Sequence, residues 1–242
     1  MKDLEFLKKN LIAHRGYHDI EKKIPENSLK AFERALQYRY IIELDVHLLK
    51  DNEIVVFHDD NLKRMTGVDK AIKDCTYSEL KKYKLKNTNL SIPTLQEVLS
   101  LVNGKVPIII ELKYDLKVGQ LESRLVEYLD SYQGKFVVKS FHPLTVRWFY
   151  KNRPDYIRGQ LVSHVHKTPK EWIVWSMITN VITKPDFISC HYNMLTANRI
   201  KKFRQKKMVL AWTIRDKKTY RLVLGKADNY ICENMNRILE KK

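Results

Sequence analysis

The chain has 242 residues, of which 44% are hydrophobic and 30% are charged. This composition indicates a folded globular protein and excludes a disordered or fibrous one. Lysine and arginine outnumber aspartate and glutamate by 45 to 28, and the resulting net charge of +17 is compatible with nucleic acid, an anionic membrane surface or phosphorylated substrates as partners.

Short apolar runs alternate along the chain with stretches of helical periodicity. The apolar runs cover residues 10–13, 41–46, 54–57, 107–112, 136–138, 157–161, 186–189, 208–212 and 230–232. Helical spacing begins at Leu29 after Ser28 as N-cap, and at Leu95 after the capping box of Thr94 and Glu97. It recurs in residues 121–129, 144–150, 172–179, 197–203 and 219–224.

Repeated strand–helix units of this kind favour a parallel sheet with helical crossovers. Eight such units close into a barrel of about 250 residues. We therefore predict an α/β protein with a (β/α)8 TIM barrel fold, and a single domain over residues 1–242.

One stretch, from Asp59 to Pro93, breaks the alternation. It is polar, rich in lysine and longer than an ordinary strand-to-helix loop, and long loops in compact domains are usually functional or form a subdomain. We predict a small insertion at about 59–93, after the second barrel strand region and on the active-site face of the barrel.

The termini and cysteines point to a cytoplasmic protein. Residues 1–10 lack the apolar stretch of a secretory signal, and the longest strong apolar run, Val106 to Ile110, is far too short for a membrane span. Cys75, Cys190 and Cys232 are odd in number and widely separated, which is not a disulfide framework. No nucleic-acid-binding motif accompanies the basic charge, so we expect no nucleic acid partner, whereas peripheral contact with an anionic membrane stays open.

Carboxylates gather at the ends of two apolar runs. Glu43 and Asp45 are two residues apart on one run, so they leave the same face of a strand while Leu44 points the other way. Glu111 and Lys113 end a second run. Three carboxylates at the mouth of an apolar barrel repel each other, and a divalent cation would neutralise them; hard oxygen donors favour Mg²⁺ or Ca²⁺ over zinc. From spacing alone, salt-bridged or solvated carboxylates explain the pattern equally well.

Two histidines shift the balance towards catalysis. His14 ends the first apolar run and His58 ends the run at 54–57. Because the ordinary pKa of histidine lies near neutrality, a pair beside carboxylates suits general acid–base chemistry. Arg15 adds a planar fork that fits a phosphate, and Lys113 adds a point charge. The set is typical of phosphoryl-ester hydrolysis rather than of sugar or acyl chemistry.

The order of these residues resembles the signature of the glycerophosphodiester phosphodiesterase family. The matching motifs, in chain order, are His14-Arg15-Gly16, Pro25-Glu26-Asn27, Ala31-Phe32, Glu43-Leu44-Asp45-Val46, His58-Asp59, Leu62 with Arg64 and Thr66, Ile92 to Val98, Ile110 to Lys113, Ser140-Phe141, Trp212-Thr213 and Asp228 to Asn234. Their order and spacing are specific in the first half of the chain. From about Val118 onward the match rests mainly on Ser140-Phe141 and Trp212-Thr213.

The resemblance implies metal-dependent hydrolysis of a glycerophosphodiester to glycerol 3-phosphate and an alcohol, on a barrel with its insertion after the His-Asp motif. It implies that Glu43, Asp45 and Glu111 bind one divalent cation, Mg²⁺ or Ca²⁺, and that His14 and His58 are the general acid and base. It places Arg15 and Lys113 on the phosphate, Glu26 and Asn27 beside the reaction centre, and Phe141 and Trp212 at the alcohol end of the cleft, where ordinary barrel packing is an equal alternative for the two aromatic residues.

The chain departs from the family pattern at two places. Tyr38 to Ile42 stands where the family often has a Gly-Ala-Asp-like segment, and Arg215 stands where an asparagine is common. Neither change touches the metal and proton-transfer residues, but both bear on the shape of the substrate pocket. Arg215 either favours a substrate with an anionic head group or is an ordinary surface charge.

Three other functions compete with this hypothesis. Two are enzymes, a sphingomyelinase-D-like and a lysophospholipase-D-like phosphodiesterase, which share the barrel and the general acid–base mechanism. The third is a barrel that binds phosphate or membranes without turnover and shares the fold alone. The alcohol released, the choice between Mg²⁺ and Ca²⁺, the roles of the two histidines, the nucleophile (water or a substrate hydroxyl) and the oligomeric state are not determined by the sequence.

Overall fold

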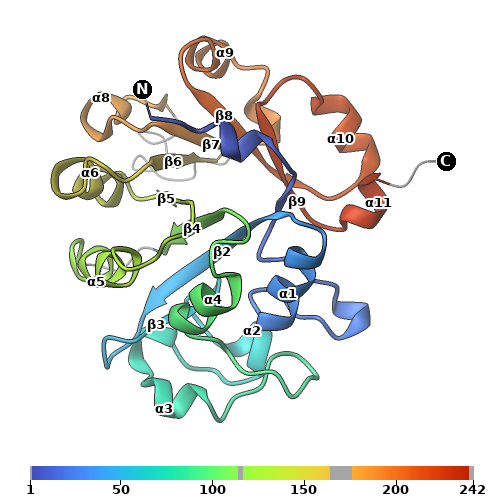
Figure 1. The fold of residues 1–242 in the computed structure, drawn as a ribbon, viewed down its shortest axis with the longest axis vertical. Coiled ribbons are helices and arrows are strands. Elements are labelled where there is room, and N and C mark those ends of the chain that lie inside the picture. Colours follow the sequence, from blue (N-terminus) through green and yellow to red (C-terminus); the bar gives the residue numbers. More distant parts are fainter. Residues whose placement is uncertain (1, 114–116, 164–175, 240–242) are drawn as a thin grey trace.

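The computed structural model describes residues 2–113, 117–163 and 176–239, which form a barrel of parallel strands surrounded by helices (Figure 1). The barrel strands are β1 (Ile12–Ala13), β2 (Ile41–Leu48), β4 (Ile108–Leu112), β5 (Phe136–Ser140), β6 (Arg158–Val162), β7 (Phe187–His191), β8 (Met208–Ile214) and β9 (Asn229–Cys232). Because β1 pairs in parallel with both β2 and β9, the sheet closes on itself. The predicted (β/α)8 barrel is confirmed.

The apolar run at 54–57 is not a barrel strand. It forms β3 (Ile54–Val56), which pairs antiparallel with the far end of β2, Val46 opposite Val56. The amide of Phe57 then donates a hydrogen bond to the carbonyl of Asp45 (3.0 Å). This hairpin turns the chain back towards the mouth of the barrel, so that His58 arrives beside the end of β2.

Helices connect the barrel strands on the outside (Figure 1). They are α1 (Leu29–Gln37), α4 (Leu95–Val102), α5 (Gln120–Leu129), α6 (Pro143–Asn152), α8 (Asn180–Thr183), α9 (Asn198–Arg204), α10 (Lys217–Val223) and α11 (Met235–Leu239). The N-cap at Ser28 and the capping box of Thr94 and Glu97 are both present. Of the helix expected at 172–179, residues 172–175 lie outside the described part. Among the described residues, no helix is long and apolar enough to cross a membrane.

The insertion follows β3 and lies at the bottom of Figure 1, in cyan to teal. It contains α2 (Lys63–Thr66), a short 3-10 turn, η3 (Ile72–Asp74), and α3 (Tyr77–Leu80). Leu62, Leu80 and Ile92 pack with Val55 and Phe57 in an apolar cluster separate from the barrel core. The insertion therefore has a hydrophobic anchor on β3 and holds the segment after His58 against the barrel mouth.

Two further apolar clusters hold the barrel together. The outer cluster lies between strands and helices, where Leu44 and Ile110 face α1 and α4 residues such as Phe32 and Val98. The inner cluster fills the barrel with residues near the strand starts, and Phe6 and Leu7 from the 3-10 helix η1 (Glu5–Lys8) join it. Apolar packing thus closes the amino end of the barrel and leaves its polar groups at the carboxyl ends of the strands, where barrel enzymes carry their active sites.

Candidate active site

Three buried carboxylates meet at the carboxyl ends of β2 and β4. Parallel pairing sets Asp45 opposite Glu111, and Glu43 lies one pleat earlier on the same face of β2. One carboxylate oxygen from each lies within 4.8 Å of the others, while Leu44 points into the outer core. Hard oxygen donors this close together could hold a divalent cation.

Two lysines hold this acidic cluster together. Lys113 Nζ lies 2.8 Å from Asp45 and 2.6 Å from Glu111, and Lys139 Nζ lies 2.9 Å from Glu43 and 3.2 Å from Glu111. Burial by itself would lower the pKa of Lys139, but Glu43 and Glu111 outweigh it and raise the pKa. Burial likewise works to raise the pKa of Asp45, yet Lys113 and Arg15 hold it well below its usual range. These pKa shifts favour the charged forms of Lys139 and Asp45.

Lys139 is a site residue that the sequence analysis missed. It is only 3% exposed, and it faces the barrel interior because β5 pairs it with Glu111. Its signal in the sequence was a lysine directly after the apolar run 136–138. Once the strand is known to belong to the barrel, a charged residue at its end is a candidate site residue. From sequence spacing alone, Lys139 could equally be a surface lysine.

The loop after β1 joins the acidic cluster through its backbone and side chains. The amide of Arg15 donates to Glu43 (2.9 Å) and its Nε lies 3.4 Å from Asp45. The side-chain amide of Asn27 donates to Asp45 (2.9 Å). Gly16 between them has φ +77°, and a Cβ on it would come within 3.0 Å of Ala31. Only glycine fits this turn, which explains the Gly that follows His14-Arg15.

His14 is held by a carboxylate from the other end of the chain. It follows β1, and its Nδ1 lies 2.6 Å from Glu233, which follows β9. Burial would raise the pKa of Glu233, but the hydrogen bond to His14 and the charge of Arg215 hold it far below its usual range. Arg215 Nε donates to the second oxygen of Glu233 (2.9 Å). Glu233 lay inside the motif 228–234, but the sequence did not single it out.

His58 has the same arrangement on the insertion side. Its Nδ1 lies 2.6 Å from Asp59, and Arg64 from α2 donates to both oxygens of Asp59. Arg64 also bonds Glu26, which in turn accepts a hydrogen bond from Arg15 (2.6 Å). A continuous chain of charge-assisted hydrogen bonds therefore connects His58 to the acidic cluster and ties the insertion to the loop after β1.

Aromatic residues line another part of the barrel mouth. Phe141, which is 40% exposed, meets Trp212 edge-to-face with ring centroids 5.7 Å apart. Trp212 donates through Nε1 to the carbonyl of Ser189 (2.9 Å) and has His191 against its ring at 5.3 Å. The structure thus brings the two predicted aromatics together, with His191 as a neighbour that the sequence analysis did not name. The other nine predicted site residues lie in or beside the polar network.

The charges of the polar network suit a metal and a phosphate together. Three carboxylates face Lys113, Lys139 and Arg15, so these side chains balance without a ligand. A divalent cation bound with a phosphodiester would add only one net positive charge, and with a doubly charged phosphomonoester none. The donor set therefore fits a cation that binds together with an anionic phosphate.

Comparison with known proteins agrees with this geometry. A family model described as the glycerophosphoryl diester phosphodiesterase family matches residues 14–238. A Bacillus altitudinis protein named glycerophosphodiester phosphodiesterase is 35% identical over 175 residues, which cover 67% of this chain and 70% of that protein.

Two solved structures share the fold. A glycerophosphodiester phosphodiesterase from Thermotoga maritima has a TM-score of 0.73 at 27% identity, over 92% of this chain and 94% of that one. An Oleispira antarctica phosphodiesterase in complex with the product sn-glycerol-3-phosphate has a TM-score of 0.81 at 24% identity, over 95% and 94% of the two chains. Since the family model spans nearly the whole sequence and includes every predicted site residue, the chain belongs to the glycerophosphoryl diester phosphodiesterase family.

Proposed function

We propose that this protein is a metal-dependent glycerophosphodiester phosphodiesterase, which hydrolyses its substrate to glycerol 3-phosphate and an alcohol. One observation carries the proposal: His14 and His58 each have Nδ1 held 2.6 Å from a carboxylate, beside the cluster of Glu43, Asp45 and Glu111. Two oriented imidazoles and a buried acidic cluster are the parts that phosphodiester hydrolysis needs.

The carboxylates beside the two histidines determine which ring nitrogen of each takes part in proton transfer. Glu233 and Asp59 both have lowered pKa values, so both are ionised at neutral pH and can only accept a hydrogen bond. The Nδ1 of each histidine therefore carries a proton, and Nε2 is the position that gains or loses the reacting proton. One histidine takes the proton of the nucleophile and the other protonates the leaving oxygen, each role worth about 10²–10⁴-fold in rate.

Glu43, Asp45 and Glu111 would hold the metal, for which Mg²⁺ and Ca²⁺ are the candidates by donor type. When bound, such an ion polarises a phosphoryl oxygen and stabilises developing negative charge. Arg15 and Lys113 bind the phosphate oxygens, Arg15 by its fork and Lys113 as a point charge. Asn27 fixes the orientation of Asp45, and Glu26 fixes that of Arg15.

The aromatic wall would take the glycerol or alcohol end of the substrate. Phe141 and Trp212 offer apolar ring surface next to charged groups. An alcohol with carbon and hydroxyl groups can contact the rings with its carbons and the charged groups with its hydroxyls. The nucleophile is water, or a neighbouring hydroxyl of the glycerol that closes a cyclic phosphate before water opens it; the same two histidines serve both routes.

The test is release of glycerol 3-phosphate from glycerophosphocholine by the wild type and by His14→Ala and His58→Ala. We expect turnover to vanish in EDTA, to return with Mg²⁺ or Ca²⁺, and to fall at least about 10²-fold in each variant. Robust turnover in EDTA, or a variant with undiminished activity, would contradict the mechanism. Turnover of lysophosphatidylcholine alone would move the assignment to a lysophospholipase D.

A further inference from the structure

The positive charge of the chain is concentrated in one stretch. Residues 199–226 contain eleven lysines and arginines against one aspartate, so these 28 residues carry +10 of the net charge of +17. The stretch covers most of α9, then β8, α10 and the turn after α10. Because β8 is buried in the barrel, the charges belong to the two helices and the turns beside them. Figure 1 shows α9 at the top and α10 on the right, away from the insertion at the bottom.

The outer side of α9 carries lysines. Ile200 packs into the barrel core, whereas Lys201 and Lys202, which follow it on the helix, are exposed. Neither lysine forms an ion pair with a residue in the described part of the chain. Since no carboxylate there neutralises them, their charges attract anionic partners from solution.

The outer side of α10 combines charge with apolar surface. Arg221 and Leu222 are exposed while Val223 is buried, and Leu224 and Lys226 follow at the end of the helix. Leu222 is 63% exposed and Leu224 is 57% exposed. Arg221 and Lys226 form no ion pair with the described residues. A partner that covered this side would remove apolar surface from water, which is favourable, and would meet two unneutralised cations.

The two helices present these groups on one connected surface. Arg204, the last residue of α9, donates through Nη1 to the carbonyl of Gly225 in the turn after α10 (2.6 Å). A pocket of about 430 Å³ lies between the two segments and is lined by Ile200, Lys201 and Lys226 among others. No acidic residue of the described chain lines it. The surface is therefore basic across both helices and hollowed where they meet.

We propose that the outer side of α9 and α10 is a docking surface for a membrane of anionic lipids. The basic face, as we call this surface, consists of Lys201, Lys202, Arg221, Leu222, Leu224 and Lys226. Basic side chains are attracted to the negative potential of an anionic bilayer. Apolar side chains among them enter the boundary between head groups and acyl chains.

The leucines favour a lipid surface over nucleic acid. Phosphates of either partner would attract the lysines, but a nucleic acid backbone offers Leu222 and Leu224 no apolar layer to enter, whereas a bilayer does. The inference goes beyond the proposed function, because the basic face contains none of the residues assigned to catalysis or to the metal.

The experiment measures co-sedimentation with vesicles of phosphatidylcholine, either pure or mixed with about one third phosphatidylglycerol. We expect the wild type to bind the mixed vesicles and not the pure ones, and to lose this binding as the salt concentration rises. The triple variant Lys201→Glu/Lys202→Glu/Lys226→Glu should bind the mixed vesicles at least about 100-fold more weakly, because each lysine at the surface contributes about fivefold.

The matched control places the same change of charge elsewhere. Lys73→Glu/Lys81→Glu/Lys82→Glu alters three exposed lysines of the insertion and should keep most of the binding. Equal loss of binding in the two triple variants would overturn the proposal, because it would mean that net charge and not this face decides. A wild type that binds pure and mixed vesicles alike would overturn it too.

The leucines are tested separately. Leu222→Ser/Leu224→Ser should weaken binding to the mixed vesicles about tenfold, whereas Leu144→Ser, at a leucine of α6 that is 51% exposed, should leave it unchanged. Equal binding by these two variants would overturn the lipid assignment. Tighter binding of the wild type to duplex DNA than to mixed vesicles would also overturn it and assign the face to nucleic acid.

Vesicle binding needs no turnover, which separates this inference from the proposed function. All variants should release glycerol 3-phosphate from soluble glycerophosphocholine as the wild type does, which also shows that they are folded. Vesicle binding by a wild type that hydrolyses no glycerophosphodiester would contradict the proposed function and leave the basic face standing. Hydrolysis by a wild type that binds no vesicles would overturn the basic face and leave the proposed function standing.

Discussion

Glu233 connects the last barrel strand to the first histidine. Its carboxylate lies 2.6 Å from Nδ1 of His14, and Arg215 donates a hydrogen bond to its other oxygen. This contact also explains the departure from the family pattern at position 215. Among the described residues, the Arg215 side chain donates two hydrogen bonds to Glu233, so its charge stabilises the carboxylate that contacts His14.

Replacing Glu233 by glutamine should lower turnover. The amide nitrogen can face Nδ1 and favour the wrong tautomer of His14, so we expect kcat for glycerophosphocholine to fall by about 10–10³-fold while KM changes little. Glu122→Gln is the control, since Glu122 is also a shielded carboxylate but caps α5 away from the site, and glutamine also serves in a capping box. Equal activities of the two variants would rule out the orienting role.

Glu26 should make stability depend on acid pH. Burial raises its pKa, but hydrogen bonds from Arg64 and the charge of Arg15 outweigh that and bring the pKa to about 2. A carboxylate with a lowered pKa stabilises the fold above its unfolded pKa of ~4.3, and this contribution is lost as the pH falls from there to about 2. It amounts to about 3 kcal/mol at neutral pH.

The test is the free energy of unfolding of the wild type and Glu26→Gln between pH 2 and 7. The difference between the two should be largest near pH 7 and should shrink steadily below pH 4.5, because only the wild type has a carboxylate to protonate there. A difference that stays constant over the whole range would mean that the ion pairs of Glu26 contribute nothing.

At the scale of elements, the packing of β6 against β7 depends on Gly159. It faces the ring of Phe187 across the register of these two parallel strands, and a Cβ at this position would overlap that ring. We expect Gly159→Ala to lower the free energy of unfolding by about 1–3 kcal/mol, the usual cost of overpacking a core. Urea unfolding measures it, and the double variant Gly159→Ala/Phe187→Leu should recover part of the loss. A single variant as stable as the wild type would contradict the contact.

The strand β3 was predictable from the sequence, but its pairing with β2 in a hairpin was not. The run at 54–57 has the apolar, β-branched character of a strand, and it is a strand. Its pairing partner, however, is the far end of β2 in antiparallel order. The composition of a buried strand is the same for both directions of pairing, so only tertiary contacts decide that this strand leaves the barrel and returns His58 to its mouth.

At the scale of the whole molecule, the N-terminal segment closes the barrel. Phe6 and Leu7 join the interior cluster with residues from the starts of the strands, such as Ile41 and Phe187, and Asn229 donates to the carbonyls of Leu7 and Asn10. The segment therefore links the first and last barrel strands.

Removing the Phe6 ring should destabilise the fold while the site stays formed. We expect Phe6→Ala to lower the free energy of unfolding by about 3–5 kcal/mol, with kcat near that of the wild type at low temperature, because Phe6 lies at the end of the barrel remote from the carboxylates. Urea unfolding and glycerol 3-phosphate release measure the two effects. Lys8→Ala, on the same 3-10 helix but exposed, should leave both unchanged. Equal stability of the two variants would show that the Phe6 ring does not help to close the barrel.

The fold class and the insertion were predictable from the sequence, and so was the grouping of the carboxylates Glu43, Asp45 and Glu111. These follow from local rules, since alternation of strand and helix patterns sets the barrel, and residues two apart on a strand share a face. The pairing of His14 and His58 with nearby carboxylates predicted general acid–base chemistry, and the family resemblance implies the same roles, which stay a prediction.

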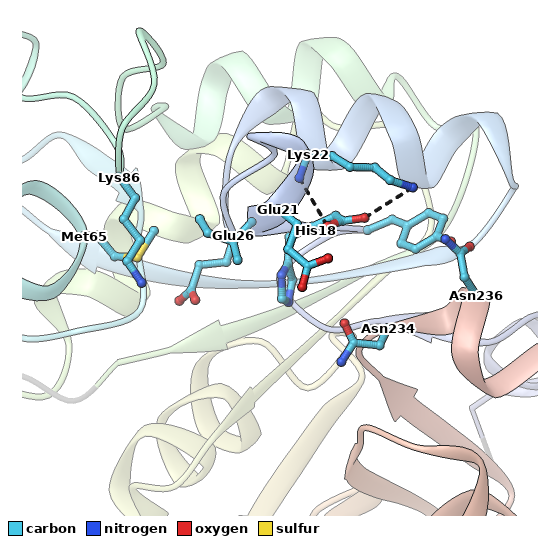
Figure 2. A pocket seen from close by; sticks show the side chains of 11 residues that line it. His18, Glu21, Lys22, Glu26, Met65, Lys86, Asn234 and Asn236 are labelled. Carbon is cyan, nitrogen blue, oxygen red and sulfur yellow. Dashed lines mark hydrogen bonds and ion pairs between the residues drawn. The ribbon is translucent and has the colours of Figure 1, made fainter.

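Which groups from distant parts of the chain meet could not be predicted from the sequence and follows from the tertiary fold. Glu233 reaches His14 across 219 residues, and Lys139 enters the acidic cluster because the register of β4 and β5 sets it opposite Glu111. The pocket lined by Glu26 and Asn234 likewise draws on the loop after β1, the insertion and the start of α11 (Figure 2). Sequence spacing describes faces of one element, whereas a site between elements depends on barrel closure and register, which arise from packing of the whole chain.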